Sequence, residues 1–294
     1  MSPSPISDLP SSSPLPVIVY SPESAIKSPR KLFREMADEL KNSHELAFAL
    51  FSRDMKAQFR QSILGYAWLF FTPIATTLVW FFLNSSGVVK VADTGMPYPA
   101  FVMIGTLLWQ AFLESLTKPI TSLNGAKAML VKLNFPRIAP VIAGIGQTTV
   151  TAAIRLVLLI PIFVFAGVEA SWTIIFFPLA YLSMVLLGVA IGSFLTPIGL
   201  LYTDIARAIG LFGQFAMYAT PVVYPVATSG FLGEVNRFNP VTYLIEVGRA
   251  TLVGGSFQHL PMVLIISGCA FVLLLIGWTI FHITVPRIIE RMGM

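Results

Sequence analysis

Few side chains in this sequence are suited to chemistry, and the most unusual of them lie within long apolar runs. Arg155 stands in "TAAIRLVLLIP", and Glu114 stands in "LLWQAFLESL". An ionisable residue inside an apolar stretch of membrane length marks a functional site, unless it pairs within the protein. Arg155 therefore either faces a hydrated path and meets an anionic substrate, or pairs internally or extends to the membrane surface.

The motifs of common enzymes and cofactor sites are absent. The sequence contains no GxxxxGK[ST], HExxH, GxSxG or GxGxxG pattern. The three histidines, His44, His259 and His282, lie far apart, and the single cysteine, Cys269, cannot form an internal disulfide. We therefore predict no catalytic residue, no metal site and no cofactor in this chain.

The composition indicates an integral membrane protein. Of the 294 residues, 55% are hydrophobic and 11% are charged, and the mean hydropathy is +0.78. A soluble domain contains about 25% charged residues. The apolar runs are continuous and lack the alternation of a barrel wall, so we predict an all-α fold. Residues 1–30, rich in Ser and Pro, are predicted to be a disordered tail before a transmembrane domain of residues 31–294.

Six stretches have about the length that a membrane-spanning helix needs. They are residues 65–86, 99–117, 138–166, 172–199, 206–226 and 262–284. With six spans, 15 of the 19 Lys and Arg residues fall on the side of the N-terminus, and three fall on the other side. The positive-inside rule then predicts that both termini are cytoplasmic. The same distribution explains the net charge of +5 without nucleic acid.

The segment before the first predicted span has the pattern of an interfacial helix. In residues 44–63, apolar residues recur at steps of three and four, and a neighbouring face carries Arg53, Lys56 and Arg60. Gly65 is placed for a bend into the first span. A simple membrane anchor would show the same composition.

Three further segments are predicted to shape the ends of the helices. Residues 121–140 have the pattern of a short amphipathic helix on the membrane surface, suited to docking a partner. Asp204 is placed as an N-cap for the fifth span. Pro221 and Pro225 are expected to distort the outer end of that span. Residues 237–255 are apolar but too short to cross, which predicts a re-entrant or interfacial segment.

Four patterns in order resemble the membrane subunit of ATP-binding-cassette exporters of lipid-linked polysaccharides, the O-antigen, capsule and teichoic-acid permeases. The resemblance covers residues 44 to about 285 and departs at Thr203, where many members have Arg. The patterns are "RDMKAQFRQSILGYAWLFFTP", "NGAKAMLVKLNFPRIAP", "YTDI", and "TPVVYP" followed by "NPVTYLIEVGR".

The resemblance implies a permease without its own ATPase in a bacterial cytoplasmic membrane. Two copies would pair with two nucleotide-binding subunits, which bind ATP and Mg²⁺, and a lipid-linked polysaccharide would pass between the copies. Residues 124–137 would form a coupling helix, with the second inner loop as another contact. The implied coupling residues are Asn124, Lys127, Leu130, Lys132, Phe135, Pro136 and Asp204.

Two further sets of residues are predicted along the path of the substrate. Sugars stack on aromatic rings, so aromatic walls suit a glycan conduit, although aromatic residues facing lipid are also common. The conduit candidates are Trp68, Phe71, Trp80, Arg155, Phe215, Tyr218 and Tyr224. The resemblance places four residues at an outer gate, namely Pro240, Tyr243, Glu246 and Arg249. Among them, Glu246 and Arg249 are expected to form an ion pair.

The interfacial helix is the predicted contact for the lipid diphosphate of the substrate carrier, through Arg53, Lys56 and Arg60. Plain contact with the head groups of membrane lipids is the alternative. For the whole chain, two other functions remain. One is an exporter of a small lipid or drug with the same fold, and the other is an ion-coupled carrier or channel.

Overall fold

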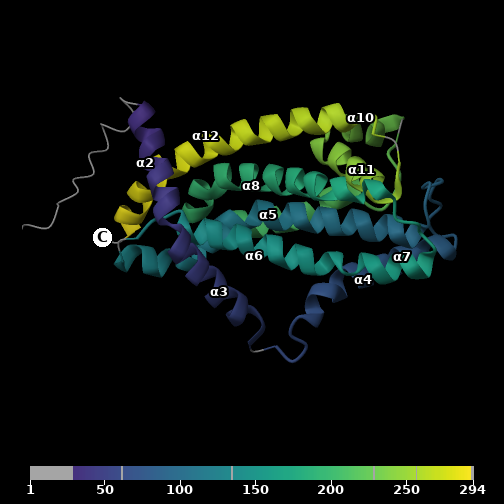
Figure 1. Ribbon diagram of the computed structural model, residues 1–294, viewed down its shortest axis with the longest axis horizontal. Coiled ribbons are helices and arrows are strands. Elements are labelled where there is room, and N and C mark those ends of the chain that lie inside the picture. Colours follow the sequence, from purple (N-terminus) through teal and green to yellow (C-terminus); the bar gives the residue numbers. More distant parts are fainter. Residues whose placement is uncertain (1–28, 61, 134, 228, 256, 293–294) are drawn as a thin grey trace, which may run out of the picture.

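The computed structural model describes residues 29–60, 62–133, 135–227, 229–255 and 257–292, and all regular structure in these ranges is helical (Figure 1). The all-α prediction is confirmed. The elements are α2 (Pro29–Asn42), α3 (His44–Arg60), α4 (Ala67–Ser85), α5 (Tyr98–Lys132), α6 (Ala139–Leu156), α7 (Leu159–Ala166), the 3-10 helix η1 (Trp172–Phe176), α8 (Phe177–Leu201), α9 (Asp204–Ala219), α10 (Gly230–Phe238), α11 (Pro240–Val253) and α12 (Leu260–Met292).

Helices α5 and α8 form the centre of the bundle, and α12 packs along the outer side of α8 (Figure 1). Gly188 and Gly192 lie one helical turn apart on α8, against the backbone of α5 at Phe112 and Leu116. A Cβ atom at either glycine would collide with that backbone. Small residues at this spacing let two helices approach closely, so van der Waals contact holds this pair together.

Five helical stretches are long and apolar enough to cross a membrane, among the residues described. They are residues 67–85, 98–132, 139–166, 172–201 and 260–291. Helix α9, the predicted fifth span, has 16 residues and is shorter than the about 20 that a crossing needs. The count of six spans therefore stays a prediction.

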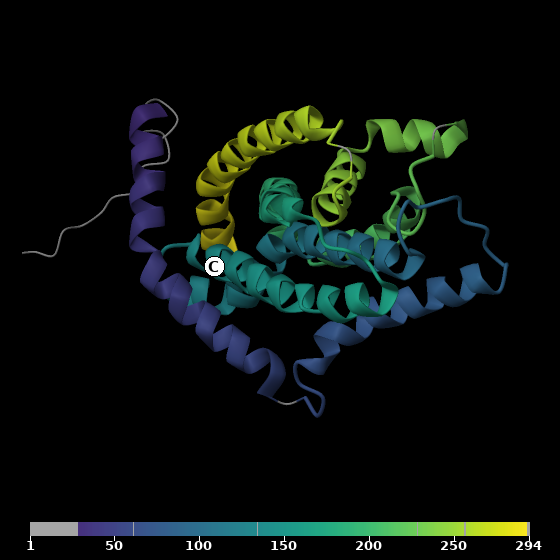
Figure 2. The same cartoon turned by 45° about the vertical axis from the view of Figure 1, so that its right-hand side comes forward.

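Helices α3 and α4 meet at a sharp bend that projects from the bundle (Figure 2). Gly65 lies in this bend with φ +49°, and its N–H donates to the hydroxyl of Ser62 at 3.0 Å. A positive φ is costly for residues with a side chain, which explains the glycine. The bend predicted at Gly65 is present, and the preceding helix ends at Arg60 rather than at residue 63.

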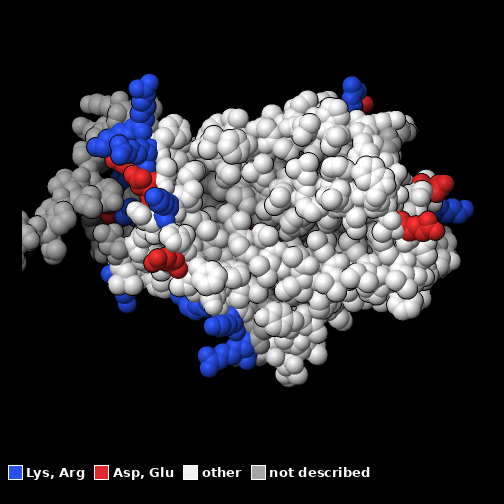
Figure 3. Space-filling view, in the orientation of Figure 1, with Lys and Arg blue, Asp and Glu red and all other residues white. Residues whose placement is uncertain are grey.

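On the face drawn in Figure 3, charged side chains gather at the two ends of the molecule, and the surface between them is uncharged. Lys and Arg cluster at the end that carries α2 and α3, which we call the basic end. The opposite end carries α10, α11 and the loop of residues 86–97 (Figures 1 and 2). An apolar belt between charged ends is the surface expected of a membrane protein.

Four further helical segments have other bounds than the stretches expected from the sequence. The short surface helix expected within residues 121–140 is the last part of α5, which continues through Pro119 to Lys132. The helix ends there, and the backbone of Leu133 is extended. The fifth span, expected to reach residue 226, ends at Ala219, since the backbone leaves the helix just before Pro221.

The other two differences concern α2 and the last span. Helix α2 begins at Pro29, inside the segment expected to be disordered, whereas residues 1–28 lie outside the described residues. The last span was expected to end at residue 284, but α12 continues to Met292. Helix α2 and the last turns of α12 are polar, and a pattern of apolar stretches does not indicate helices of this kind.

Candidate functional site

The predicted coupling segment presents two different faces at the basic end. Leu130 is 6% exposed and belongs to a buried cluster with Leu200 of α8, against which Phe135 also packs. Val131, Lys132 and Leu133 point away from this cluster and are exposed. The exposed face of the segment therefore includes residues 131–133, whereas Leu130 and Phe135 hold the segment in place.

Asn124 connects α5 to the end of α8. Its side-chain amide donates to the carbonyl of Gly199 at 2.9 Å. This bond ties the start of the predicted coupling segment to α8, three residues before the turn of residues 202–203. Lys127 and Pro136 are half-buried on the same segment.

Asp204 does not act as the predicted N-cap. Thr203 is the N-cap of α9 and makes no capping hydrogen bond with its side chain. Asp204 is the first helical residue, is exposed, and lies 3.5 Å from Arg207 as an ion pair one turn away. A carboxylate in the first turn still interacts favourably with the helix dipole.

The basic face of α3 is only partly free. Arg53 forms an ion pair with Asp54 at 2.8 Å and donates to the sulfur of Met129 at 3.4 Å. Lys56 and Arg60 are exposed. The opposite face, with Ala47 and Leu50, packs against α6. Helix α3 is thus fixed to the bundle and presents two free cations.

Four of the seven conduit candidates lie exposed on α4 and α9, and a fifth, Trp80, joins these helices. The ring of Trp80 contacts that of Tyr218 with centroids 6.1 Å apart. The exposed candidates are Trp68, Phe71, Phe215 and Tyr218. Tyr224 instead packs against the core, and its hydroxyl interacts with the side chain of Asn236.

Arg155 lies apart from these aromatic residues, on α6. Its guanidinium forms an ion pair with Glu114 of α5 at 2.5 Å, and the two side chains are 13% and 35% exposed. Of the alternatives open for Arg155, internal pairing is the one observed. The pair links α5 to α6 within the apolar belt.

The expected ion pair between Glu246 and Arg249 does not form in the described structure. Arg249 is 5% exposed, and its guanidinium donates to the carbonyls of Pro221, Val222 and Phe101 at 2.8, 2.5 and 3.2 Å. It also lies 3.5 Å from the centroid of the Phe101 ring. Glu246 pairs with His259 at 3.4 Å. The guanidinium of Arg249 donates to backbone carbonyls rather than to Glu246, because buried carbonyls need hydrogen-bond donors.

Burial acts on the pKa of both residues. It raises the pKa of Glu246, and the charges of His259 and Arg249 oppose this change. It lowers the pKa of Arg249 to about 9, with Glu246 opposing. The guanidinium therefore stays protonated at neutral pH and can donate to all three carbonyls.

The other two predicted gate residues shape α11. Pro240 is its first residue, where a missing N–H costs nothing. The hydroxyl of Tyr243 donates to the carbonyl of Arg237 at 2.7 Å, which holds α11 against the end of α10.

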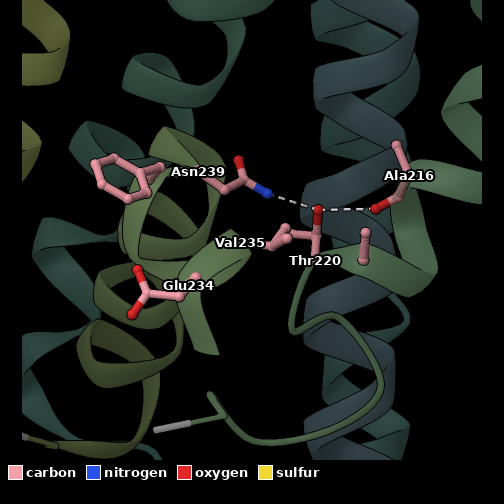
Figure 4. A pocket seen from close by; sticks show the side chains of 7 residues that line it. Ala216, Thr220, Glu234, Val235 and Asn239 are labelled. Atoms are coloured by element: carbon pink, nitrogen blue, oxygen red, sulfur yellow. Dashed lines mark hydrogen bonds between the residues drawn. The ribbon is translucent and has the colours of Figure 1, made fainter. Parts of the chain in front are cut away.

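An open apolar groove of about 570 Å³ lies between α9 and α10 (Figure 4). Asn239 donates to Thr220 at 2.8 Å, and Thr220 donates to the carbonyl of Ala216 at 2.9 Å. These bonds join the end of α9 to the start of α11. Glu234 is the one charged residue in the groove lining (Figure 4).

The basic end contains a polar junction that the sequence did not reveal. One carboxylate oxygen of Glu39 in α2 lies 2.8 Å from Nδ1 of His282 in α12, and the other accepts from the backbone N–H of Arg137 at 3.1 Å.

Within the described ranges, no group of three His, Cys, Asp or Glu residues is arranged to hold a metal ion.

Comparison with known proteins agrees with this architecture. The ABC-2 type transporter family matches residues 45–253, from the start of α3 to the end of α11. The chain belongs to this family.

Two relatives of this ABC-2 chain illustrate the likeness. The O-antigen export system permease protein RfbA of Myxococcus xanthus is 26% identical over 196 residues, which cover 65% of this chain and 72% of the relative. The protein of the same name from Klebsiella pneumoniae is 22% identical over 249 residues, which cover 81% and 91%.

Proposed function

We propose that this chain is the transmembrane subunit of an ATP-driven exporter that moves a lipid-linked polysaccharide, such as an O-antigen or a capsule, across the bacterial cytoplasmic membrane. The observation that carries the proposal is the likeness to O-antigen export permeases over most of both chains. ATP hydrolysis would belong to two nucleotide-binding subunits, which would bind ATP and Mg²⁺, and a second copy of this chain would complete the path.

The basic end supports a contact with the ATPase. Lys132 and Leu133 are exposed where α5 ends, and Asp204 is exposed where α9 begins. The bond from Asn124 to Gly199 ties α5 to the end of α8. An exposed apolar side chain beside a cation is suited to binding a soluble protein. In this arrangement both termini would be cytoplasmic.

Six crossings are compatible with the packing of α9. Gly213 of α9 lies against Leu113 of α5, and Tyr98 at the start of α5 donates to the carbonyl of Val223 at 3.0 Å. Helix α9 thus runs along α5 toward its outer end. Its 16 residues extend about 24 Å, and the turn that follows continues this path.

The exposed aromatic face of α4 and α9 is the proposed wall of the conduit. Trp68, Phe71, Phe215 and Tyr218 would face the second copy across the path, where sugar rings can stack on them. Helices α10 and α11 would close the outer end, held by Arg249. Lys56 and Arg60 are placed for contact with anionic head groups at the inner surface.

Co-purification tests the proposal. The chain should co-purify with a nucleotide-binding ATPase, and mass spectrometry of the complex should detect a lipid-linked glycan. A complex that carries only small lipids or drugs would favour the alternative exporter of the same fold. Full activity of the isolated chain without ATP would contradict the proposal and favour an ion-coupled carrier or a channel.

A further inference from the structure

A small cavity with polar walls lies between α5 and α6 within the apolar belt, and α3 contributes to its wall. Its volume is about 240 Å³, well above the about 30 Å³ that one water molecule occupies in the liquid. Its lining residues are Gln58, Glu114, Thr117, Lys118, Thr121, Gln147, Thr148, Thr151 and Arg155. Polar walls in an apolar bundle are costly unless the space holds a polar group.

The charges around the cavity leave one cation without a partner. The carboxylates that act on Lys118 are Glu114 and Asp54. Glu114 already pairs with Arg155 at 2.5 Å, and Asp54 already pairs with Arg53 at 2.8 Å. Among the described residues, the side-chain ammonium of Lys118 forms no ion pair and no hydrogen bond, and only its backbone carbonyl accepts, from Thr121. The surplus charge on the cavity wall is therefore positive.

One cationic donor at the cavity has no acceptor among the described residues. Nε of Arg155 is buried and has no hydrogen-bond partner in the described structure. The hydroxyls of Thr117 and Thr151 donate to carbonyls of their own helices, and the amide of Gln147 donates to Gln58 at 2.5 Å. A buried donor without a partner indicates a missing acceptor. An anion with several oxygens would meet this need and the surplus charge together.

The cavity is connected to the inner surface. Glu114 and Thr121 are seven residues apart on α5, so the polar strip along this helix is about 10 Å long. It starts near the middle of α5 and ends beside Gln58 of the interfacial helix α3. Gly144 lets α6 approach the stem of Lys118, because a Cβ there would lie 3.0 Å from the Cγ of Lys118. The lysine is thus held at the cavity.

We propose that this cavity binds the phosphate group of a membrane lipid, with Lys118 and Arg155 as its cationic donors and Glu114 as the residue that orients Arg155. Phosphate oxygens accept charge-assisted hydrogen bonds from both side chains, and the lipid chain would remain in the surrounding membrane. The inference rests on the proposed function, since a lipid-linked substrate presents such a phosphate at the inner surface.

The test uses the full chain purified in a maltoside detergent, which contains no phosphate. A photoreactive isoprenyl diphosphate labels the protein, and unlabelled isoprenyl diphosphate, isoprenyl alcohol, phosphatidylglycerol and inorganic phosphate compete with it. Lys118→Gln should weaken binding about tenfold, because one hydrogen bond to a charged group is lost. Lys118→Arg should retain binding, and Lys41→Gln, which removes a cation of α2 outside the cavity, should leave binding unchanged.

Each outcome decides the proposal. Equal labelling of Lys118→Gln and the unchanged chain overturns it, as does competition by the alcohol or by inorganic phosphate as strong as that by the diphosphate. Competition by phosphatidylglycerol equal to that by the diphosphate supports the phosphate site and assigns it to ordinary phospholipids. If Lys118→Gln does not elute as a single species, Gln147→Glu serves as the second variant, because it adds a negative charge to the cavity wall. It should weaken binding of the diphosphate more than tenfold. Unchanged binding by this variant overturns the proposal.

The site and the proposed function can fail separately. Normal export of polysaccharide by the complex together with equal labelling of the variants would overturn the cavity inference alone. Labelling that depends on Lys118, in a complex that exports no polysaccharide, would overturn the proposed function and leave the phosphate site in place.

Discussion

The side-chain amide of Asn124 in α5 donates to the carbonyl of Gly199 in α8 at 2.9 Å, across 75 residues of sequence. The bond ties the coupling segment, which starts at Asn124 on α5, to the end of α8, which leads into the turn before α9. A force applied to either segment would be transmitted to the two central helices of the bundle. Coupling to an ATPase would therefore depend on residues that do not themselves touch it.

Asn124→Ala should reduce transport per ATP hydrolysed. It removes this hydrogen bond, which contributes about 1 kcal/mol to stability, so the fold should persist while the two segments separate more easily. Transport and ATP hydrolysis measured on the same reconstituted complex give the ratio. Gly125→Ala is the control, because a Cβ at Gly125 meets no neighbouring atom. An unchanged ratio in Asn124→Ala would count against the coupling role.

Lys132→Glu and Leu133→Asp should abolish binding of the ATPase and leave the membrane domain folded. Both side chains are exposed, so their replacement changes the surface and not the packing. Leu130→Ala, one turn away in the buried cluster, should instead destabilise the fold by about 2–5 kcal/mol. Size-exclusion chromatography of the complex, with thermal unfolding of each variant, separates the two effects. Normal complex formation by both surface variants would refute the docking surface.

Arg249→Met should destabilise the outer end of the molecule by about 3 kcal/mol. It leaves the carbonyls of Pro221 and Val222 without this donor, and each buried unsatisfied group costs about 1–3 kcal/mol. The loss should appear as a lower temperature of thermal unfolding. Arg237→Met removes an exposed cation at the same end and should change stability by less than about 0.5 kcal/mol. Equal melting of the two variants would contradict this role of Arg249.

Phe215→Ala should slow export of polysaccharide without lowering the amount of folded protein. An aromatic contact contributes about 0.5–1.5 kcal/mol, so the rate should fall about two- to tenfold if sugars stack on this ring. Phe271→Ala on α12 is the matched control, since Phe271 is 54% exposed on a helix away from the proposed path. The same decrease in both variants would indicate a general effect of lipid-facing aromatic residues.

The apolar runs predicted the long helices, because burial of backbone polar groups in a membrane leaves few alternatives to helix. The bend at Gly65 was also predictable, since it lies between a charged and an apolar helix. Helix α2 was missed because its sequence is polar and follows a Ser- and Pro-rich segment. The division of the coupling segment into buried Leu130 and exposed Leu133 could not be predicted, since both are leucines and only tertiary packing distinguishes them.

The charged residues were harder to place than the helices. One-turn spacing suggested that Glu246 pairs with Arg249, but carbonyls from two distant segments compete for the guanidinium, and sequence spacing contains no information on them. The partner of Arg155 lies on a different helix, so its identification required the packing of α5 against α6. The junction of Glu39 with His282 spans 243 residues and has no local pattern.

Transport by a reconstituted complex tests the central proposal most directly. The chain and its nucleotide-binding subunit would be placed in vesicles, and the transfer of a lipid-linked polysaccharide across the bilayer would be measured with and without ATP. We predict that transfer requires ATP, both proteins and the lipid-linked glycan. Transfer without ATP or without the partner, or ATP-driven transfer of small lipids but no glycan, would contradict the account.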